Sequence, residues 1–157
     1  MVRDELAELQ AGGINTVLCT CSTLGSVAEA CGRELDLAVT HIDRAMMNLA
    51  LNCGFRILLI ATLTSTLPPS RELLTSMAKD RDLPVEVKSH LIDGAWRHFV
   101  RGETRAYLRS VEITLENIDM QCFDACVLAQ ASMANIDQPY QALVPVFTPL
   151  ETGLDAL

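Results

Sequence analysis

The chain has 157 residues, and half of them are hydrophobic, which is enough apolar material for a buried core. Twelve basic residues stand against 20 acidic ones, for a formal net charge of −8. A nucleic-acid or anionic-membrane surface needs a basic patch, and none is evident, because Arg97, Arg101 and Arg105 are interleaved with Glu103. We therefore expect neither nucleic acid nor a membrane as a partner, and we expect these arginines to form a solvated helix face.

The sequence gives no indication of export or of membrane insertion. The longest apolar run, residues 57–63, is too short to cross a bilayer. Residues 1–5 are typical of the start of an acidic amphipathic helix rather than of a signal peptide. We therefore expect a cytoplasmic protein.

The six cysteines are expected to be free thiols, because a disulfide framework normally accompanies export. Cys19 and Cys21 form a C-x-C pair, but no second short pair follows at the spacing of a zinc site. The three histidines, His41, His90 and His98, are scattered and are expected at the surface or at an interface. The sequence therefore predicts no metal site.

Helices and strands are predicted to alternate along the chain. Short apolar runs bounded by turn residues predict strands buried on both faces, and apolar residues at helical spacing predict helices. In chain order we expect a helix at 3–10, a strand at 14–20, helices at 26–33 and 41–52, a strand at 56–61, a helix at 70–81, a strand at 84–89, a long helix at 93–117, a strand at 124–130, a short strand at 144–147 and a terminal helix from 151.

This alternation predicts an α/β protein with a parallel sheet and helices on both of its faces. Three of the strands are followed by turns of small or hydroxylated residues, at 21–23, 62–66 and 130–132. Ligands of open α/β sheets bind beyond the carboxyl ends of the strands. The three turns are therefore expected to form a small polar pocket for an anion.

Cys21 is the strongest candidate for chemistry. It ends an apolar strand and precedes a helix, so the helix dipole and free backbone amides would favour its thiolate form. Ser22 and Thr23 would offer hydroxyl and N–H donors to a carboxylate. The alternative is a buried, unreactive cysteine, which is the commoner role of a free thiol and the one expected for Cys19 and Cys126.

The turn at 62–66 has two compatible interpretations. Its hydroxyl and amide groups could hold a carboxylate at the start of the following helix, or they could simply cap that helix. Glycine-rich nucleotide-binding motifs and the G-x-S-x-G motif of serine hydrolases are missing from the sequence. Thiol and carboxylate chemistry is therefore the kind that the sequence supports.

Five segments carry a resemblance to a known family. They are the strand-plus-cysteine run 17–23 (VLCTCST), the helix entry 41–46 (HIDRAM), the Thr-rich turn 60–68, the segment 127–134 (VLAQASMA) and the closing strand 145–149 (PVFTP). In this order they resemble the aspartate/glutamate racemase superfamily, which includes hydantoin racemases, maleate isomerases and arylmalonate decarboxylases. The resemblance spans nearly the whole chain.

The resemblance implies an α/β fold of two pseudo-equivalent lobes, each a small parallel sheet flanked by helices, with the site in the cleft between them. The first lobe would hold residues 1–55 plus 144–157, and the second lobe would hold residues 56–143. It also implies chemistry without a cofactor. The substrate would be a small carboxylic acid, such as an amino or dicarboxylic acid with an acidic α-carbon.

The resemblance also implies the roles of the site residues. Cys21 matches the family's first catalytic thiol and would either remove the α-proton as a base or attack the substrate as a nucleophile. The second thiol would lie at or beside Gln130, and a glutamine cannot exchange a proton, although its amide can hydrogen-bond an oxyanion. Gln130 would therefore be a positioning donor in a single-thiol reaction, and binding of the substrate carboxylate would fall to Ser22, Thr23, Thr62, Ser65, Thr66, Ala131 and Ser132.

The resemblance therefore implies a cofactor-independent enzyme of the racemase and isomerase type. One alternative is a different single-thiol reaction on the same fold, either decarboxylation or cis–trans isomerisation of a dicarboxylate. The other alternative is a non-catalytic protein that binds a small carboxylate. Product analysis separates the reactions, and stabilisation by a ligand without chemistry identifies the binding protein.

Family members usually carry another strand and helix before the first cysteine, whereas this chain opens at the helix just ahead of it. Without that strand the first sheet is expected to have an exposed edge, which is a liability unless another chain covers it. The exposed edge and the high apolar fraction are compatible with a homo-oligomer.

Overall fold

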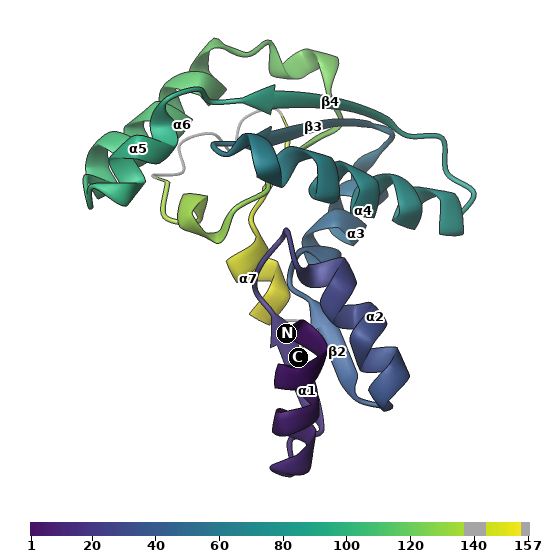
Figure 1. Cartoon of the computed structure of the whole chain (residues 1–157). Helices are drawn as coiled ribbons and strands as arrows, with labels where there is room; N and C mark the ends of the chain where they lie inside the picture. The colour runs from purple at the N-terminus through teal and green to yellow at the C-terminus, as the bar shows by residue number, and fades with distance from the viewer. Residues whose placement is uncertain (137–143, 155–157) are drawn as a thin grey trace.

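Helices and parallel strands alternate in the computed structural model, which describes residues 1–136 and 144–154 (Figure 1). The strands are β1 (Thr16–Cys19), β2 (Ala38–His41), β3 (Arg56–Ala61), β4 (Glu86–Leu91), β5 (Ala125–Leu128) and β6 (Val146–Phe147). The α-helices are α1 (Val2–Ala11), α2 (Gly25–Leu35), α3 (Asp43–Cys53), α4 (Leu67–Asp80), α5 (Ala95–Val100), α6 (Thr104–Asn117) and α7 (Pro149–Leu154). The smaller sheet pairs β1 with β2, and the larger has the order β4-β3-β5-β6, with parallel pairing throughout the described strands. The expected α/β fold with two small parallel sheets flanked by helices is confirmed.

The larger sheet is buried on both faces. Ile57 and Leu59 of β3 point to one face, where they pack with α3 and α4. Leu58 and Ile60 point to the other face, where they pack against α6. All four are at most 1% exposed. Cover on both faces explains why β3 and β5 are continuous apolar runs rather than alternating patterns.

The smaller sheet has much less cover. β1 and β2 pair from Thr16 opposite Ala38 to Cys19 opposite His41, and α2 packs against β2. Thr16 is exposed and the rest of β1 is only partly buried. The expectation of a strand buried on both faces is therefore wrong for β1. In the part of the chain that the structure describes, no strand pairs with the second edge of β1.

Two further predictions of local structure differ from the structure. The segment 41–52 was expected to be wholly helical, but His41 ends β2 and the helix begins at Asp43. The expected long helix at 93–117 is two helices, α5 and α6. Gly102 lies between them with a φ of 72°, a left-handed conformation that glycine adopts without strain and that turns the chain.

The helix α3 and the strand β6 belong to the larger sheet by their packing. Met46 and Met47 of α3 are buried in its core, and β6 pairs with β5. Both elements lie in the segments expected in the first lobe, 1–55 plus 144–157. Figure 1 shows α3 and α7 between the larger sheet above and the unit of α1, β1, α2 and β2 below. The structure thus defines two units by their sheets, and helices α3 and α7 join them.

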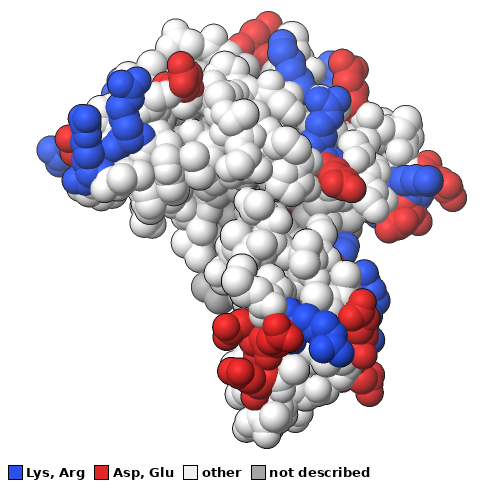
Figure 2. Space-filling view, in the orientation of Figure 1, with Lys and Arg blue, Asp and Glu red and all other residues white. Residues whose placement is uncertain are grey.

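Charged side chains are unevenly distributed over the surface. Figure 2 shows acidic and basic side chains mixed on the lower unit, and mainly basic side chains at the far end of α5. Arg97, Arg101 and Arg105 are exposed there, but they are divided between α5, the turn after it and α6 rather than spaced along one helix. Among the described helices, none combines the length and the apolar character needed to span a bilayer.

Candidate active site at the carboxyl ends of the strands

Cys21 lies on the exposed turn that leads from β1 into α2. The backbone N–H groups of Leu24 and Gly25 donate to the carbonyl oxygen of Cys21 at 3.1 and 2.9 Å, which closes the turn at the start of the helix. Free backbone amides were expected at the start of this helix, but the amides of Leu24 and Gly25 are engaged by the backbone. The positive end of the α2 dipole still lies at this turn, and it favours a negative charge there.

His41 supports the turn from inside the protein. Its side chain is 1% exposed, so the expectation of a surface or interface histidine is wrong. Nδ1 accepts the backbone N–H of Asp43 at 3.1 Å, so the ring proton is on Nε2, 3.3 Å from the carbonyl oxygen of Ser22. Both ring nitrogens are therefore satisfied in the neutral form. His41 holds the turn as a neutral hydrogen-bond donor.

Gly25 makes room for this imidazole. A Cβ atom placed on Gly25 would lie 1.6 Å from Cδ2 of His41, well inside van der Waals contact. The first residue of α2 must therefore be a glycine if the ring is to reach the carbonyl of Ser22.

Glu29 joins the elements around the turn. Its carboxylate accepts the backbone N–H of His41 at 3.0 Å and two N–H groups of the Arg44 guanidinium. Burial by itself would raise the pKa of Glu29, but the hydrogen bonds from Arg44 and His41 hold that pKa below its usual value. Helix α2, strand β2 and helix α3 are thereby fastened together.

The Cys21 turn also reaches the larger sheet. The hydroxyl of Ser22 donates to the carbonyl oxygen of Ala129 at 3.2 Å, across 107 residues of sequence. Ala129 directly follows β5 and precedes Gln130. The carboxyl ends of β1 and β5 thus come together although the two strands belong to different sheets.

Gln130 connects the carboxyl ends of β3 and β5. Its Oε1 accepts the backbone N–H of Thr62 at 2.6 Å and the Thr62 hydroxyl at 2.9 Å. Thr62 Oγ1 lies 3.3 Å from the Tyr107 hydroxyl, which lies 2.7 Å from Ser132 Oγ. Because Oε1 is engaged by Thr62, the amide –NH₂ of Gln130 is the end that can serve as a donor to a ligand.

The structure therefore brings together several of the residues predicted for the site. Cys21, Ser22 and Thr23 share one turn, and Ser22 contacts the strand end that continues into Gln130, Ala131 and Ser132, of which Gln130 is joined to Thr62. Ser65 and Thr66 lie in a short 3-10 helix, Thr64–Thr66, with Ser65 exposed and Thr66 buried. Within the described residues, no side-chain hydrogen bond links these two residues to the rest of the group.

Three residues close to the site were not among the predicted site residues. Tyr107 was expected only as part of an apolar core stripe, and it is fully buried, but its hydroxyl connects Thr62 to Ser132. His41 and Asp43 support the Cys21 turn. No local pattern could have revealed these roles, because they depend on contacts between segments far apart in sequence.

The other thiols near the sheets are less suited to reaction. Cys126 is completely buried in β5, as expected, and burial raises the pKa of its thiol. Cys19 is half-buried with its Sγ 3.8 Å from the Cys21 carbonyl oxygen, and burial raises the pKa of its thiol as well. Over the residues that the structure describes, no group of three or more His, Cys, Asp or Glu side chains is placed to hold a metal ion.

Comparison with known families identifies the class of protein. The sequence model of the Asp/Glu/Hydantoin racemase family matches residues 1–157, so this chain belongs to that family. No curated protein sequence matches it significantly.

Solved structures agree with the fold. A protein from Yersinia pestis described as a proposed Asp/Glu racemase superposes with a TM-score of 0.71 at 14% identity, over 99% of this chain and 70% of the other. A mutant of arylmalonate decarboxylase gives a TM-score of 0.61 at 17% identity, over 99% of this chain and 70% of the other. Allantoin racemase from Klebsiella pneumoniae gives 0.64 at 20% identity, over 99% of this chain but 62% of that one. The chain thus spans well under the full length of each of these proteins.

Proposed function

We propose that this chain catalyses cofactor-independent proton abstraction from a small amino or dicarboxylic acid, with Cys21 as the single thiolate base. The observation that carries the proposal is the hydrogen bond from Ser22 to Ala129. It sets the turn of the exposed Cys21 thiol against the strand end that continues into Gln130 and Ser132. Membership of the racemase family supports this class of chemistry.

In the proposed mechanism, the turn after β1 supplies the thiolate base and the end of β5 supplies a hydrogen-bond donor. An α-proton beside a carboxylate is weakly acidic, so its removal requires donors that stabilise the enolate-like oxygen. In this proposal the Gln130 amide –NH₂ faces that oxygen, while its Oε1 stays bound to Thr62. Because the Ser22 hydroxyl donates to Ala129, Ser22 would bind the substrate carboxylate through its backbone N–H, together with Thr23 beside the thiol and with Ser65, Thr66 and Ala131 further out.

Ser132 can take part only if its hydroxyl proton turns. Thr62 donates to Gln130 Oε1, so Tyr107 donates to Thr62 and Ser132 in turn donates to Tyr107. To donate to a carboxylate, Ser132 must direct its proton outward, and Tyr107 then donates to Ser132 instead. In that direction the Thr62 hydroxyl donates to Tyr107, and Gln130 Oε1 keeps the backbone N–H of Thr62, so a bound anion would determine the direction of the chain.

The test is α-proton exchange in deuterated water, followed by NMR across a panel of small amino and dicarboxylic acids. We expect exchange to fall at least about 100-fold in Cys21→Ala, which is the scale of general-base catalysis. Cys53→Ala is the matched control, because Cys53 is also exposed but lies on α3 outside the site, and it should leave exchange unchanged. A fully active Cys21→Ala protein would end the proposal.

The stereochemical outcome tests the role of Gln130. With one thiol, the proton should return to the face from which it left. Inversion accompanying exchange would show that a second proton donor exists, and it would contradict the positioning role of Gln130.

The second candidate is a single-thiol decarboxylase or cis–trans isomerase of a dicarboxylate. It is favoured by the glutamine at position 130, since neither reaction requires a thiol on each side of the carbon. Decarboxylation would release carbon dioxide, and isomerisation would conserve mass. Thermal stabilisation by a carboxylate without any turnover would instead identify a binding protein.

The proposed partner is a small carboxylic acid. A homo-oligomer formed over the uncovered edge of β1, a cytoplasmic location and the lack of nucleic-acid binding stay predictions. Sedimentation velocity with and without substitutions in β1 would test the first of them.

A further inference from the structure

Asp43 is a buried carboxyl group beside the site that the proposed mechanism does not use. It is the first residue of α3, and its side chain is 0% exposed. Neither carboxyl oxygen makes a hydrogen bond with any described residue. Buried polar groups are normally satisfied, so an unsatisfied carboxyl in this position calls for an explanation.

The neighbouring histidine cannot supply the missing hydrogen bond. Nδ1 of His41 lies 3.9 Å from Oδ2 of Asp43, but it already accepts the backbone N–H of Asp43 and so carries no proton. The two groups are therefore not a charged pair. The remaining ring nitrogen, Nε2, is directed to Ser22.

Other ionisable groups near Asp43 are also occupied or poorly suited. Glu29 of α2 and Arg44 of α3 are paired with each other. A negative charge on Asp43 would contribute to the raised pKa of Cys19 in β1, but the Cys19 thiol is directed at the carbonyl of Cys21. The hydroxyl of Ser22 is left: His41 contacts Ser22 through Nε2 and Asp43 through Nδ1, so both residues adjoin the same ring, and the Ser22 hydroxyl lowers the pKa of Asp43 in the way a hydrogen-bond donor does.

Ser22 has one hydroxyl proton and two acceptors that compete for it. In the structure the proton goes to the carbonyl oxygen of Ala129 at 3.2 Å. A protonated Asp43 can donate to Ser22 Oγ and leave this bond intact. An ionised Asp43 can only accept, and a charged acceptor makes the stronger hydrogen bond, so it would draw the Ser22 proton away from Ala129.

We propose that Asp43 is a positioning residue that acts through Ser22 on the contact between the two sheets. With Asp43 protonated, Ser22 bonds to Ala129 and holds the Cys21 turn against the end of β5. When Asp43 loses its proton to solvent, Ser22 turns to the carboxylate and the contact with Ala129 is lost.

The electrostatics favour a transition at a higher pH than that of an exposed aspartate. Burial raises the pKa of the Asp43 carboxyl; a neutral His41 adds no opposing charge, and the Ser22 hydroxyl opposes the rise only in part. The form with a protonated Asp43 and an intact Ser22–Ala129 hydrogen bond therefore persists to a higher pH than it would with an exposed aspartic acid. The inference concerns the same site as the proposed function, but its test does not depend on catalysis.

The carbonyl of Ala129 can be observed by itself. Ala129–Gln130 is the only Ala-Gln dipeptide in the sequence, so labelling alanine with ¹³C at the carbonyl and glutamine with ¹⁵N isolates this one peptide group in a carbonyl-edited NMR spectrum. We follow its ¹³C shift from about pH 4 to about pH 9 and expect a titration with its midpoint above the usual value for aspartate of about 4. A shift that does not change over this range in the folded wild-type protein would overturn the proposal without any variant.

Two variants assign the titration to its cause. Asp43→Asn keeps the size of the side chain but cannot ionise, and Ser22→Ala removes the proton that the two acceptors share. Each should abolish the titration of Ala129 completely, whereas Asp93→Asn, a matched change at an exposed aspartate, should leave it unchanged. A titration that survives in folded Ser22→Ala would show that Asp43 does not act through Ser22, and the proposal would fail.

The reactivity of the Cys21 thiol gives a second readout. Modification by a dithiodipyridine, quantified for each cysteine by peptide mass spectrometry, allows Cys21 to be compared with exposed Cys53 in the same molecule. The ratio of their rates should change at the midpoint of the Ala129 titration in wild type and stay constant in Asp43→Asn. A ratio that changes equally in both proteins would overturn the proposal. If the protein passes these tests but catalyses no α-proton exchange, the inference about Asp43 holds and the proposed function fails.

Discussion

The two sheets of this protein differ in burial, and the difference matches their parts in the candidate site. The larger sheet is covered on both faces, and β3 and β5 are buried along nearly their whole length. The smaller sheet is two strands wide, and β1 is at best half-buried. The buried sheet carries the hydrogen-bonded group around Gln130, whereas the exposed sheet presents the Cys21 thiol. The hydrogen-bond donors therefore come from the buried unit, and the thiol comes from the more exposed one.

The contrast in burial predicts unequal effects of the same substitution. Leu59→Ala in β3 removes a side chain that is 0% exposed and should lower the free energy of unfolding by about 2–5 kcal/mol. Leu18→Ala in β1 removes a half-buried side chain and should cost only about 1 kcal/mol. Urea denaturation of both variants checks this. Equal losses would show that β1 is buried by something beyond the described contacts.

The close packing of the Cys21 turn predicts a second, smaller effect. Gly25→Ala places a methyl group 1.6 Å from the His41 ring, and we expect a loss of about 1–3 kcal/mol in the free energy of unfolding. Gly12→Ala is the control. Its nearest neighbour would be 3.3 Å away and its φ is −75°, so a change within about 0.5 kcal/mol is expected. If Gly25→Ala were as harmless as Gly12→Ala, His41 would not support the turn as described.

Burial of Asp43 predicts an unusual pH dependence of stability. Its folded pKa is raised by burial, so its contribution is favourable below the unfolded value of about 4 and is lost as the pH rises through the folded pKa. Asp43→Asn, which does not ionise, should therefore have a higher Tm than wild type in mildly alkaline buffer. The difference should shrink as the pH approaches about 4. Scanning calorimetry at several pH values checks both statements, and a variant less stable than wild type at high pH would contradict them.

Asp124 predicts the opposite pH dependence of stability, and the effect should be smaller because its carboxyl group is more exposed than that of Asp43. Hydrogen bonds from the Arg56 side chain and from the backbone of Arg56 and Phe55 lower the pKa of Asp124 to about 2. Its stabilising effect is present above the unfolded value and is lost as the pH falls from about 4 to about 2. Asp124→Asn should lower the Tm at neutral pH, and the deficit should narrow in acid. A deficit that does not depend on pH would assign the effect to shape rather than to charge.

The parts of the fold that the sequence predicted are those that depend on local pattern. The strand at 56–61 was predicted with its observed bounds, because an uninterrupted apolar run signals a strand covered on both faces. β2 was missed because Ala38–His41 is short and its exposed and buried residues do not form a clear pattern. The break at Gly102 was missed because apolar residues at helical spacing continue on both sides of it.

The candidate site likewise contains residues that a local pattern reveals and contacts that it does not. Cys21 could be singled out from its place at a strand end, and Gln130 from its place in the family pattern. The bond between Gln130 and Thr62 joins residues 68 apart, and Tyr107 reaches Thr62 across 45 residues, so neither has a local signature. Burial of His41 depends on the glycine at position 25, which lies on another element.

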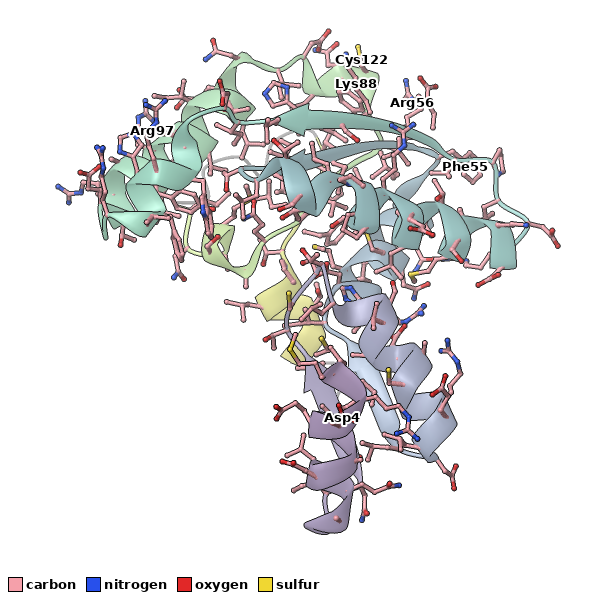
Figure 3. All side chains as sticks on the ribbon, in the orientation of Figure 1. Asp4, Phe55, Arg56, Lys88, Arg97 and Cys122 are labelled. Atoms are coloured by element: carbon pink, nitrogen blue, oxygen red, sulfur yellow. The ribbon has the colours of Figure 1, made fainter. Side chains whose placement is uncertain are left out.

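The bonds at the two ends of β3 have a consequence for strand register. At the start of β3, Asp124 accepts the backbone N–H groups of Phe55 and Arg56. Figure 3 labels these two residues at the opposite side of the molecule from Arg97. At the other end, Gln130 accepts the backbone N–H of Thr62. Both acceptors flank β5, and the same number of residues separates Asp124 from Gln130 as separates Arg56 from Thr62. A slip of β3 against β5 in either direction would break both bonds at once, so the side chains that fix the alignment of these strands also fix where the polar end of the site lies.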